Sequence, residues 1–95
     1  MASAFDHFTL TELAKNGIRV NAVNPGAVET NFLVNAGLSE EQSKNIVAEH
    51  AKVHPINERN VKVEEVVDAI LFLASDKATM INGSCLRVDG GRALT

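Results

Sequence analysis

The chain has 95 residues, a hydrophobic content of 45% and a formal net charge of −3, which together suit one small domain with a modest core. The acidic balance argues against nucleic acid and against an anionic membrane surface as partners, because both need a basic face. No apolar run approaches the roughly 20 residues of a membrane span, and no charged start precedes an apolar signal core. We therefore expect a cytoplasmic protein, with the mitochondrial matrix or the peroxisome left open. Cys85 is the single cysteine, so no internal disulfide or multi-cysteine metal site is expected.

The first predicted element is an amphipathic helix from Ser3 to Lys15, whose apolar residues recur at steps of three and four. The pair Asn16-Gly17 ends it. Asp6 and His7 lie near its start, but neighbouring helix positions point about 100° apart, which favours a structural or solvated interpretation over a functional pair.

A short strand and a turn follow between Gly17 and Thr30. Residues 18–23 alternate apolar and polar side chains, which is typical of a strand, and Asn24-Pro25-Gly26 then predicts an abrupt turn. In open α/β sheets ligands bind beyond the carboxyl ends of the strands. The tripeptide alone is a weak signal that favours an ordinary turn, so its surroundings decide between the two interpretations.

Residues 27–38 show no sustained period and predict a loop, after which Ser39-Glu40-Glu41-Gln42 is a capping-box pattern that opens a helix to about Lys52. The apolar face of this helix is thin, so we expect it to be loosely docked. His50 and His54 are four residues apart, a spacing that can bind a metal. Pro55 follows at once and no third ligand is evident, so solvated or capping histidines are favoured and no metal site is predicted.

Residues 55–62 form a polar connection, in which Glu58 and Arg59 are expected in a solvated turn and Asn57 and Asn60 are suited to positive φ angles. A helix from Val63 is then the clearest prediction in the chain. Its apolar stripe falls at i, i+3, i+4, i+7, i+8 and i+11, and comprises Val63, Val66, Val67, Ile70, Leu71 and Ala74.

Further apolar residues, Ala69, Phe72 and Leu73, widen that stripe beyond one face, so core packing and a subunit contact are both expected of the helix. The final strand runs from Ser84 to Val88 and holds Cys85, which we interpret as a small buried hydrophobe. Two strands separated by helices imply a parallel crossover connection.

Four motifs in this order resemble the carboxyl-terminal third of a short-chain dehydrogenase/reductase, and the resemblance runs from about Ala4 to Ala93. The motifs are Asn16-Gly17-Ile18-Arg19-Val20-Asn21, Asn24-Pro25-Gly26-Ala27-Val28-Glu29-Thr30, Leu71-Phe72-Leu73-Ala74-Ser75-Asp76 and Val88-Asp89-Gly90-Gly91. The resemblance implies an α/β fold, the carboxyl-terminal fragment of a Rossmann-like doubly wound parallel sheet. Residues 1–95 would then form one partial domain with two parallel strands and about three helices.

Members of this family transfer a hydride between the nicotinamide of NAD or NADP and a small carbonyl or alcohol substrate. The resemblance implies that Pro25 and Gly26 form the turn beside the nicotinamide ring. It also implies that the Val28 backbone reaches the carboxamide and that the Thr30 hydroxyl contacts the carboxamide or the pyrophosphate. The helix after Ser39 would be the substrate lid, and the Val63 helix with the Ser84 strand would form a homo-oligomer interface.

Several parts of the family pattern are missing. The chain has no tyrosine, and its six glycines form no G-x-x-x-G-x-G phosphate-binding motif. Ala2 stands where the lysine of the catalytic Tyr-x-x-x-Lys belongs, and the chain is about three residues shorter than the family pattern between Thr11 and Glu12. We therefore predict no catalytic residues, no tight cofactor binding by this chain alone, and no activity without the rest of the fold.

Two other functions stay open at this point. The chain could be a non-catalytic interaction module that docks on a full-length relative, or a degenerate product without function. The choice between NAD and NADP also stays open, because the residues that discriminate the two cofactors lie in a part of the family fold that this sequence does not match. The substrate stays open because the lid region varies with the substrate and is the least transferable part of the resemblance.

Overall fold

The computed structural model describes residues 6–29 and 32–94. Within these residues, two short strands and four helices follow one another, with 3₁₀ turns at Asp76–Ala78 and Arg92–Leu94. The elements are α1 (His7–Lys15), β1 (Ala22–Pro25), α2 (Phe32–Asn35), α3 (Glu40–Lys52), α4 (Val63–Ala74) and β2 (Cys85–Val88). The predicted α/β fold is confirmed, and α2 is a fourth, single-turn helix inside the segment that we expected to be a loop.

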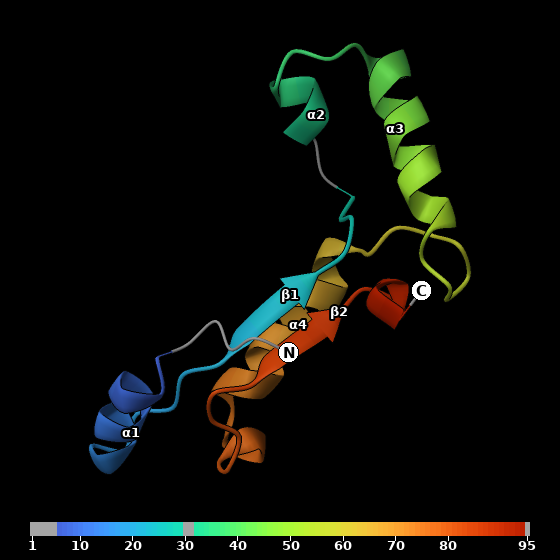
Figure 1. The fold of residues 1–95 in the computed structure, drawn as a ribbon. Helices are drawn as coiled ribbons and strands as arrows, with labels where there is room; N and C mark the ends of the chain where they lie inside the picture. Colours follow the sequence, from blue (N-terminus) through green and yellow to red (C-terminus); the bar gives the residue numbers. More distant parts are fainter. Residues whose placement is uncertain (1–5, 30–31, 95) are drawn as a thin grey trace.

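The body of the molecule consists of the two strands and α4. The strands are parallel neighbours, with Ala22 opposite Cys85 and Pro25 opposite Val88, and α4 lies against both of them on one face of the sheet (Figure 1). Helix α1 projects from one end of this body, and α2 with α3 projects from the other (Figure 1). The radius of gyration is 16.4 Å, against about 13 Å for a compact domain of this size, so the fold is elongated.

The core is correspondingly small. Among the described residues, the buried hydrophobic side chains are Val61, Leu73 and Ala78. Within the same residues, no helix is long and apolar enough to cross a membrane. A core of this size stabilises a chain only modestly.

Strand β1 lies further along the chain than the sequence predicted. The ladder includes Asn24 and Pro25, which we expected in the turn. Along β1 and the residue after it, the backbone N–H groups of even-numbered residues point toward β2. Ala22 N donates to Ser84 O at 2.9 Å, and Gly26 N donates to Val88 O at 3.0 Å. The Pro25 nitrogen therefore faces the opposite edge of the strand, where its missing N–H leaves the β1–β2 ladder intact.

Residues 18–21, predicted as strand, are held mainly by side chains instead. Val20 N donates to Asn82 Oδ1 at 2.9 Å, and Ser84 N donates to Asn21 Oδ1 at 3.0 Å. The reason is that the facing chain turns at Asn82-Gly83, where Gly83 has a φ of 76°. Asparagine side chains thus replace ladder bonds next to that turn.

Helix α4 has the predicted bounds but buries a different face. Leu73, expected only to widen the stripe, is buried at 8% exposure, whereas Ile70 is 49% and Leu71 60% exposed. Val66 and Ala69 are half-buried and lie on the same side of the helix as Leu73. The inward face therefore consists of residues 66, 69 and 73, at positions i, i+3 and i+7. Two strands cover only a narrow face of a helix, which leaves much of the predicted core stripe in contact with solvent.

Side-chain hydrogen bonds cap the amino-terminal ends of α1 and α3. Asp6 caps α1 by accepting from Phe8 N, which gives it a structural role, and the segment before it lies outside the described residues. The capping box at Ser39 is present, with Gln42 N donating to the Ser39 hydroxyl at 3.1 Å. Asn57 has the expected positive φ of 57°, but Glu58 at 45° is the second such residue in place of Asn60.

Candidate cofactor-side site

The candidate site is the turn Gly26–Val28, which begins where β1 leaves the sheet. Three separate segments hold it. Gly26 N donates to Val88 O at 3.0 Å, and Ala27 O accepts from Val61 N at 2.9 Å. Ala27 N donates to His54 Nε2 at 3.2 Å. Backbone held from three sides in this way is preorganised for a ligand.

The Val28 peptide groups face away from that support. Val28 and Val61 form an isolated parallel bridge, in which Val61 bonds to the flanking residues, accepting from Glu29 N at 2.9 Å. In a parallel bridge the N–H and C=O of the middle residue point to the opposite side. Val28 therefore presents one donor and one acceptor outward, a pair that complements the carboxamide of a nicotinamide.

Gly26 is required by close packing rather than by an unusual φ angle. A Cβ at this position would lie 2.5 Å from His54 Nε2 and 3.1 Å from Asp89 Cβ. The turn after β1 and the turn after β2 are therefore in direct contact. Only a residue without a side chain allows that approach.

Asp89 shapes the turn after β2. Its carboxylate accepts from Gly91 N at 2.9 Å and from Ala93 N at 3.1 Å. These backbone donors, Gly91 foremost, lower the pKa of Asp89. The carboxylate thus caps the Asp89-Gly90-Gly91 turn and the 3₁₀ turn behind it, and its role here is structural.

An ion pair lies next to the same turn. Arg59 donates to both Glu65 oxygens at 2.7 Å, and the Arg59 hydrogen bond, with help from Lys62 N, lowers the pKa of Glu65 to about 2. The pair lines a cavity of about 350 Å³ together with Gly90 and Gly91. Arg59 is therefore not in a merely solvated turn, as the sequence suggested, because its guanidinium is fixed by both carboxylate oxygens.

The structure brings Pro25, Gly26 and Val28 to one edge of the sheet, whereas Thr30 lies outside the described residues. Sequence reasoning missed His54, for which we expected a solvated or helix-capping side chain. His54 is 1% exposed; its side chain accepts from Ala27 N, while its backbone N–H donates to Ala51 O of the helix that precedes it. The only signal in the sequence was Pro55, which ends that helix and turns the chain inward.

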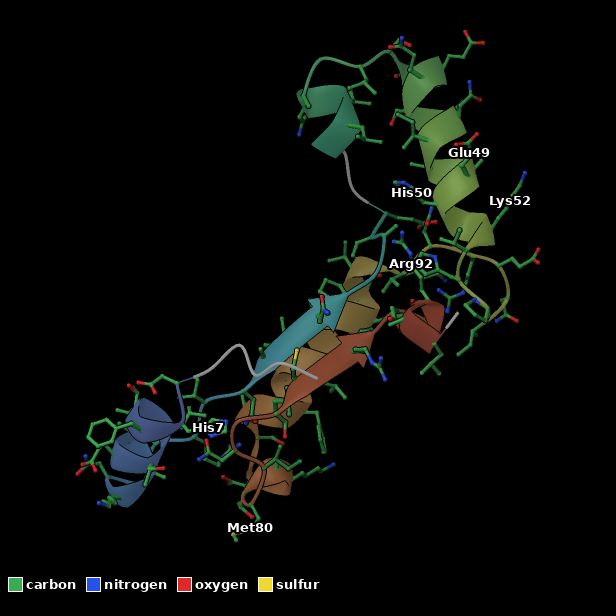
Figure 2. The ribbon with its side chains drawn as sticks, in the orientation of Figure 1. His7, Glu49, His50, Lys52, Met80 and Arg92 are labelled. Carbon is green, nitrogen blue, oxygen red and sulfur yellow. The ribbon has the colours of Figure 1, made fainter. Side chains whose placement is uncertain are left out.

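The other histidines do not join His54. His7 on α1 and His50 on α3 lie at opposite ends of the molecule (Figure 2), and His50 is exposed. Among the residues that the structure describes, no three His, Cys, Asp or Glu side chains are grouped so that they could hold a metal ion.

Helix α3 is attached to the rest of the molecule mainly at its carboxyl end. Among the named elements it lies against α2 only. Asn60, 4% exposed, donates to Val47 O at 2.9 Å, and His54 follows the helix end at Val53. Helix α3 is therefore held mainly at one end, close to the candidate turn, and an element with few attachments opens locally at low cost.

The fold defines an α/β protein of the Rossmann-like type, with the candidate turn at the carboxyl end of a parallel strand. Comparison with known proteins gives the same class. A family model described as enoyl-(acyl carrier protein) reductase matches residues 5–93. The chain belongs to this family of short-chain dehydrogenases/reductases.

Curated relatives match over most of this chain. It is 38% identical to pteridine reductase 1 of Leishmania tarentolae over 84 residues, which are 88% of this chain and 26% of the relative. It is 45% identical over 80 residues to the uncharacterized oxidoreductase YmfI of Bacillus subtilis, covering 84% of this chain and 30% of the relative. The 3-oxoacyl-[acyl-carrier-protein] reductase FabG of Buchnera aphidicola is 42% identical over 82 residues, with 84% and 30% covered. The chain therefore spans under a third of each of these relatives.

Proposed function

We propose that this chain supplies the nicotinamide side, the substrate lid and an oligomer interface of an NAD(P)-dependent oxidoreductase that interconverts a carbonyl and an alcohol. The observation that carries the proposal is the outward-facing Val28 peptide on a turn held by β2, Val61 and His54. The family match and the oxidoreductase names of the relatives support the class of chemistry. The proposed location is the cytoplasm.

In this proposal Pro25 and Gly26 lie beside the nicotinamide ring, Val28 N–H and C=O bind its carboxamide, and Thr30 contributes its hydroxyl. The nicotinamide supplies or accepts the hydride when bound. The chain orients the ring and limits access through α3. Because it has no tyrosine and no glycine-rich phosphate motif, we propose that the proton donor and the pyrophosphate receptor come from outside these 95 residues, and that the chain alone is inactive.

The proposed oligomer contact is formed by the outward face of α4 and by β2. Val63, Val67 and Leu71 are 46%, 43% and 60% exposed and lie four residues apart along one side of the helix. An apolar stripe of this kind is typical of a protein contact. It equally favours the second candidate function, a non-catalytic module that docks through this face on a full-length relative.

The test of the site is an NMR titration of the ¹⁵N-labelled chain with nicotinamide mononucleotide, and with 5′-AMP as the matched control. We expect the amide shifts of Gly26, Ala27 and Val28 to move with the nicotinamide nucleotide alone, with a dissociation constant weaker than about 1 mM. Shifts that move equally with both nucleotides, or elsewhere in the chain, would contradict the assignment of the turn.

The test of the incomplete site is calorimetric titration with NADH and NADPH. A few hydrogen bonds of about 0.5–1.5 kcal/mol each do not hold a dinucleotide whose other half has no receptor. Binding tighter than about 1 mM, equivalent to roughly 4 kcal/mol, would show that the chain forms a complete receptor by itself.

A further inference from the structure

His54 occupies a closed position between the two turns at the carboxyl edge of the sheet. Its side chain is 1% exposed, although Val53 before it and Pro55 after it are exposed. A Cβ on Gly26 would lie 2.5 Å from His54 Nε2, and a Cβ on Gly90 would lie 3.6 Å from His54 Cβ. The imidazole therefore fills a space that these two glycines leave, and its place is fixed by packing.

The hydrogen bond of His54 fixes its tautomer. Nε2 accepts from Ala27 N at 3.2 Å, so in the neutral ring the proton is on Nδ1. Nδ1 is buried and has no partner among the described residues. Burying that N–H without a partner is costly, which indicates that the bond at Nε2 and the packing of the ring together offset the cost.

We propose that His54 is a positioning residue that holds the Gly26–Val28 turn in its ligand-receiving shape and links it to the end of helix α3. This inference rests on the proposed function of the turn. The bond to Ala27 N lies one residue before the outward-facing Val28 peptide, so it restrains that peptide together with the Val61 bridge. His54 directly follows the C-cap of α3, so a displacement of the lid also moves the imidazole and breaks or strains its bond to the turn.

The link is specific because α3 has few other attachments. Its second polar tie, Asn60 Nδ2 to Val47 O at 2.9 Å, joins the helix to the connection before α4 and does not touch the turn. Among the described residues, the hydrogen bond of the His54 side chain thus joins the end of the lid directly to the candidate site. Loss of the imidazole should free the Ala27 amide, while the bonds of the turn to Val88 and Val61 remain and α3 stays anchored through Asn60.

The decisive measurement needs no nucleotide. In the uniformly ¹⁵N-labelled chain, an N–H···N hydrogen bond transmits a scalar coupling between the Ala27 amide nitrogen and His54 Nε2, and the imidazole nitrogen shifts report the Nδ1-protonated tautomer. We expect both signals. An unfolded chain, a folded chain without the coupling, or a ring protonated on Nε2 would overturn the proposal.

Two variants separate positioning from simple filling of space. His54→Gln keeps an acceptor near the Nε2 position, whereas His54→Phe fills the volume without one. We expect amide exchange at Ala27 to rise about tenfold in His54→Phe and to stay within about threefold of the wild type in His54→Gln. The Ala22 amide, bonded to Ser84 O, is the internal control. Equal exchange at Ala27 in both variants would overturn the proposal.

The two proposals can fail separately. If the Ala27–His54 coupling is present but nicotinamide mononucleotide leaves the turn unshifted, the link stands and the proposed site is wrong. If the turn responds to the nucleotide in a chain without the coupling, the site stands and the link is wrong. Should His54→Phe fail to fold, the coupling in the wild-type chain still decides.

Discussion

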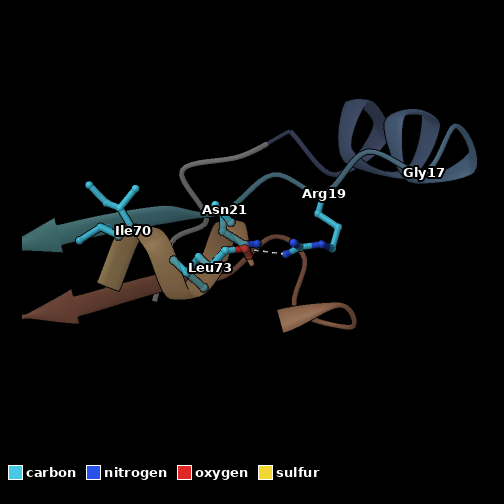
Figure 3. A pocket seen from close by; sticks show the side chains of 7 residues that line it. Gly17, Arg19, Asn21, Ile70 and Leu73 are labelled. Atoms are coloured by element: carbon cyan, nitrogen blue, oxygen red, sulfur yellow. Dashed lines mark hydrogen bonds between the residues drawn. The ribbon is translucent and has the colours of Figure 1, made fainter. Parts of the chain in front are cut away.

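Arg19 should contribute more to the stability of this fold than any other surface-reaching charge. Its guanidinium donates to Leu73 O at 2.8 Å, Ser75 O at 3.3 Å and Ile81 O at 3.3 Å, and Figure 3 shows it directed at the end of α4. The last turn of α4 contains no basic residue of its own. Arg19 thus caps orphan carbonyls and complements the negative end of the helix dipole.

We predict that Arg19→Met destabilises the chain by about 2–3 kcal/mol. Hydrogen bonds from a charged group contribute about 1.5–3 kcal/mol when well formed, and two of the three bonds here are long. Arg19→Lys should lose about half as much, because an ammonium keeps the charge but cannot span several carbonyls. With a urea dependence of about 1–3 kcal/mol per molar, Arg19→Met moves the unfolding midpoint down by roughly 0.7–3 M.

The assay is urea unfolding followed by far-UV circular dichroism. Lys44→Met serves as the matched control, since Lys44 is exposed on α3 and its loss changes the net charge equally. We expect the control to stay within about 0.5 kcal/mol of the wild type. If Arg19→Met behaves like Lys44→Met, the reasoning from the α4 carbonyls is refuted.

Three further predictions concern the edges of the fold. The pKa of Glu65 is about 2 in the folded chain, below its ordinary value of 4.5, so the Arg59–Glu65 pair stabilises the fold fully above pH 4.5. This stabilisation is lost as the pH falls through about 2, and the difference in urea midpoint between the wild type and Glu65→Gln should vanish there. Ser39→Ala should cost about 1 kcal/mol locally and speed amide exchange in the first turn of α3, while the global midpoint stays unchanged. Gly26→Ala should destabilise by about 1–3 kcal/mol. In a double-mutant cycle, combining Gly26→Ala with His54→Ala should recover part of that loss, because the imidazole that the new methyl group would meet is gone. Strictly additive losses of stability would contradict the close contact between Gly26 and His54.

Local signals in the sequence predicted α3, α4 and the final strand well, whereas the single-turn helix α2 lies in a segment that we expected to be a loop. The capping box at Ser39 and the apolar period from Val63 to Ala74 are set by neighbours within one or two turns, and α3 and α4 have the expected bounds. The bounds of β1 depended on its partner instead. Where the chain facing residues 18–21 turns at Asn82-Gly83, strand-like residues form side-chain bonds rather than a ladder.

The side chains that hold the candidate site could not be recognised from local patterns. His54, Asn60 and Arg19 each bond to a backbone group more than ten positions away, and such pairings follow from topology rather than from sequence spacing. Leu73 shows the same limit within one helix. Periodicity identified an apolar helix, but only the position of the two strands decided which face became buried.

Pro25 explains how the strand β1 can belong to a sheet and lead directly into the candidate site. Among the described residues β1 pairs with β2 alone, and its other edge borders a groove of about 400 Å³ lined by Arg19, Val23 and Ile70, among others. An added strand at this edge could bond to β1 only as far as Pro25, whose nitrogen faces that edge without an N–H. The backbone then bends toward Val61, so the Val28 peptide stays outside any extended ladder. The proline that ends the free edge thereby keeps the following turn, and with it the proposed carboxamide contact of Val28, outside the sheet.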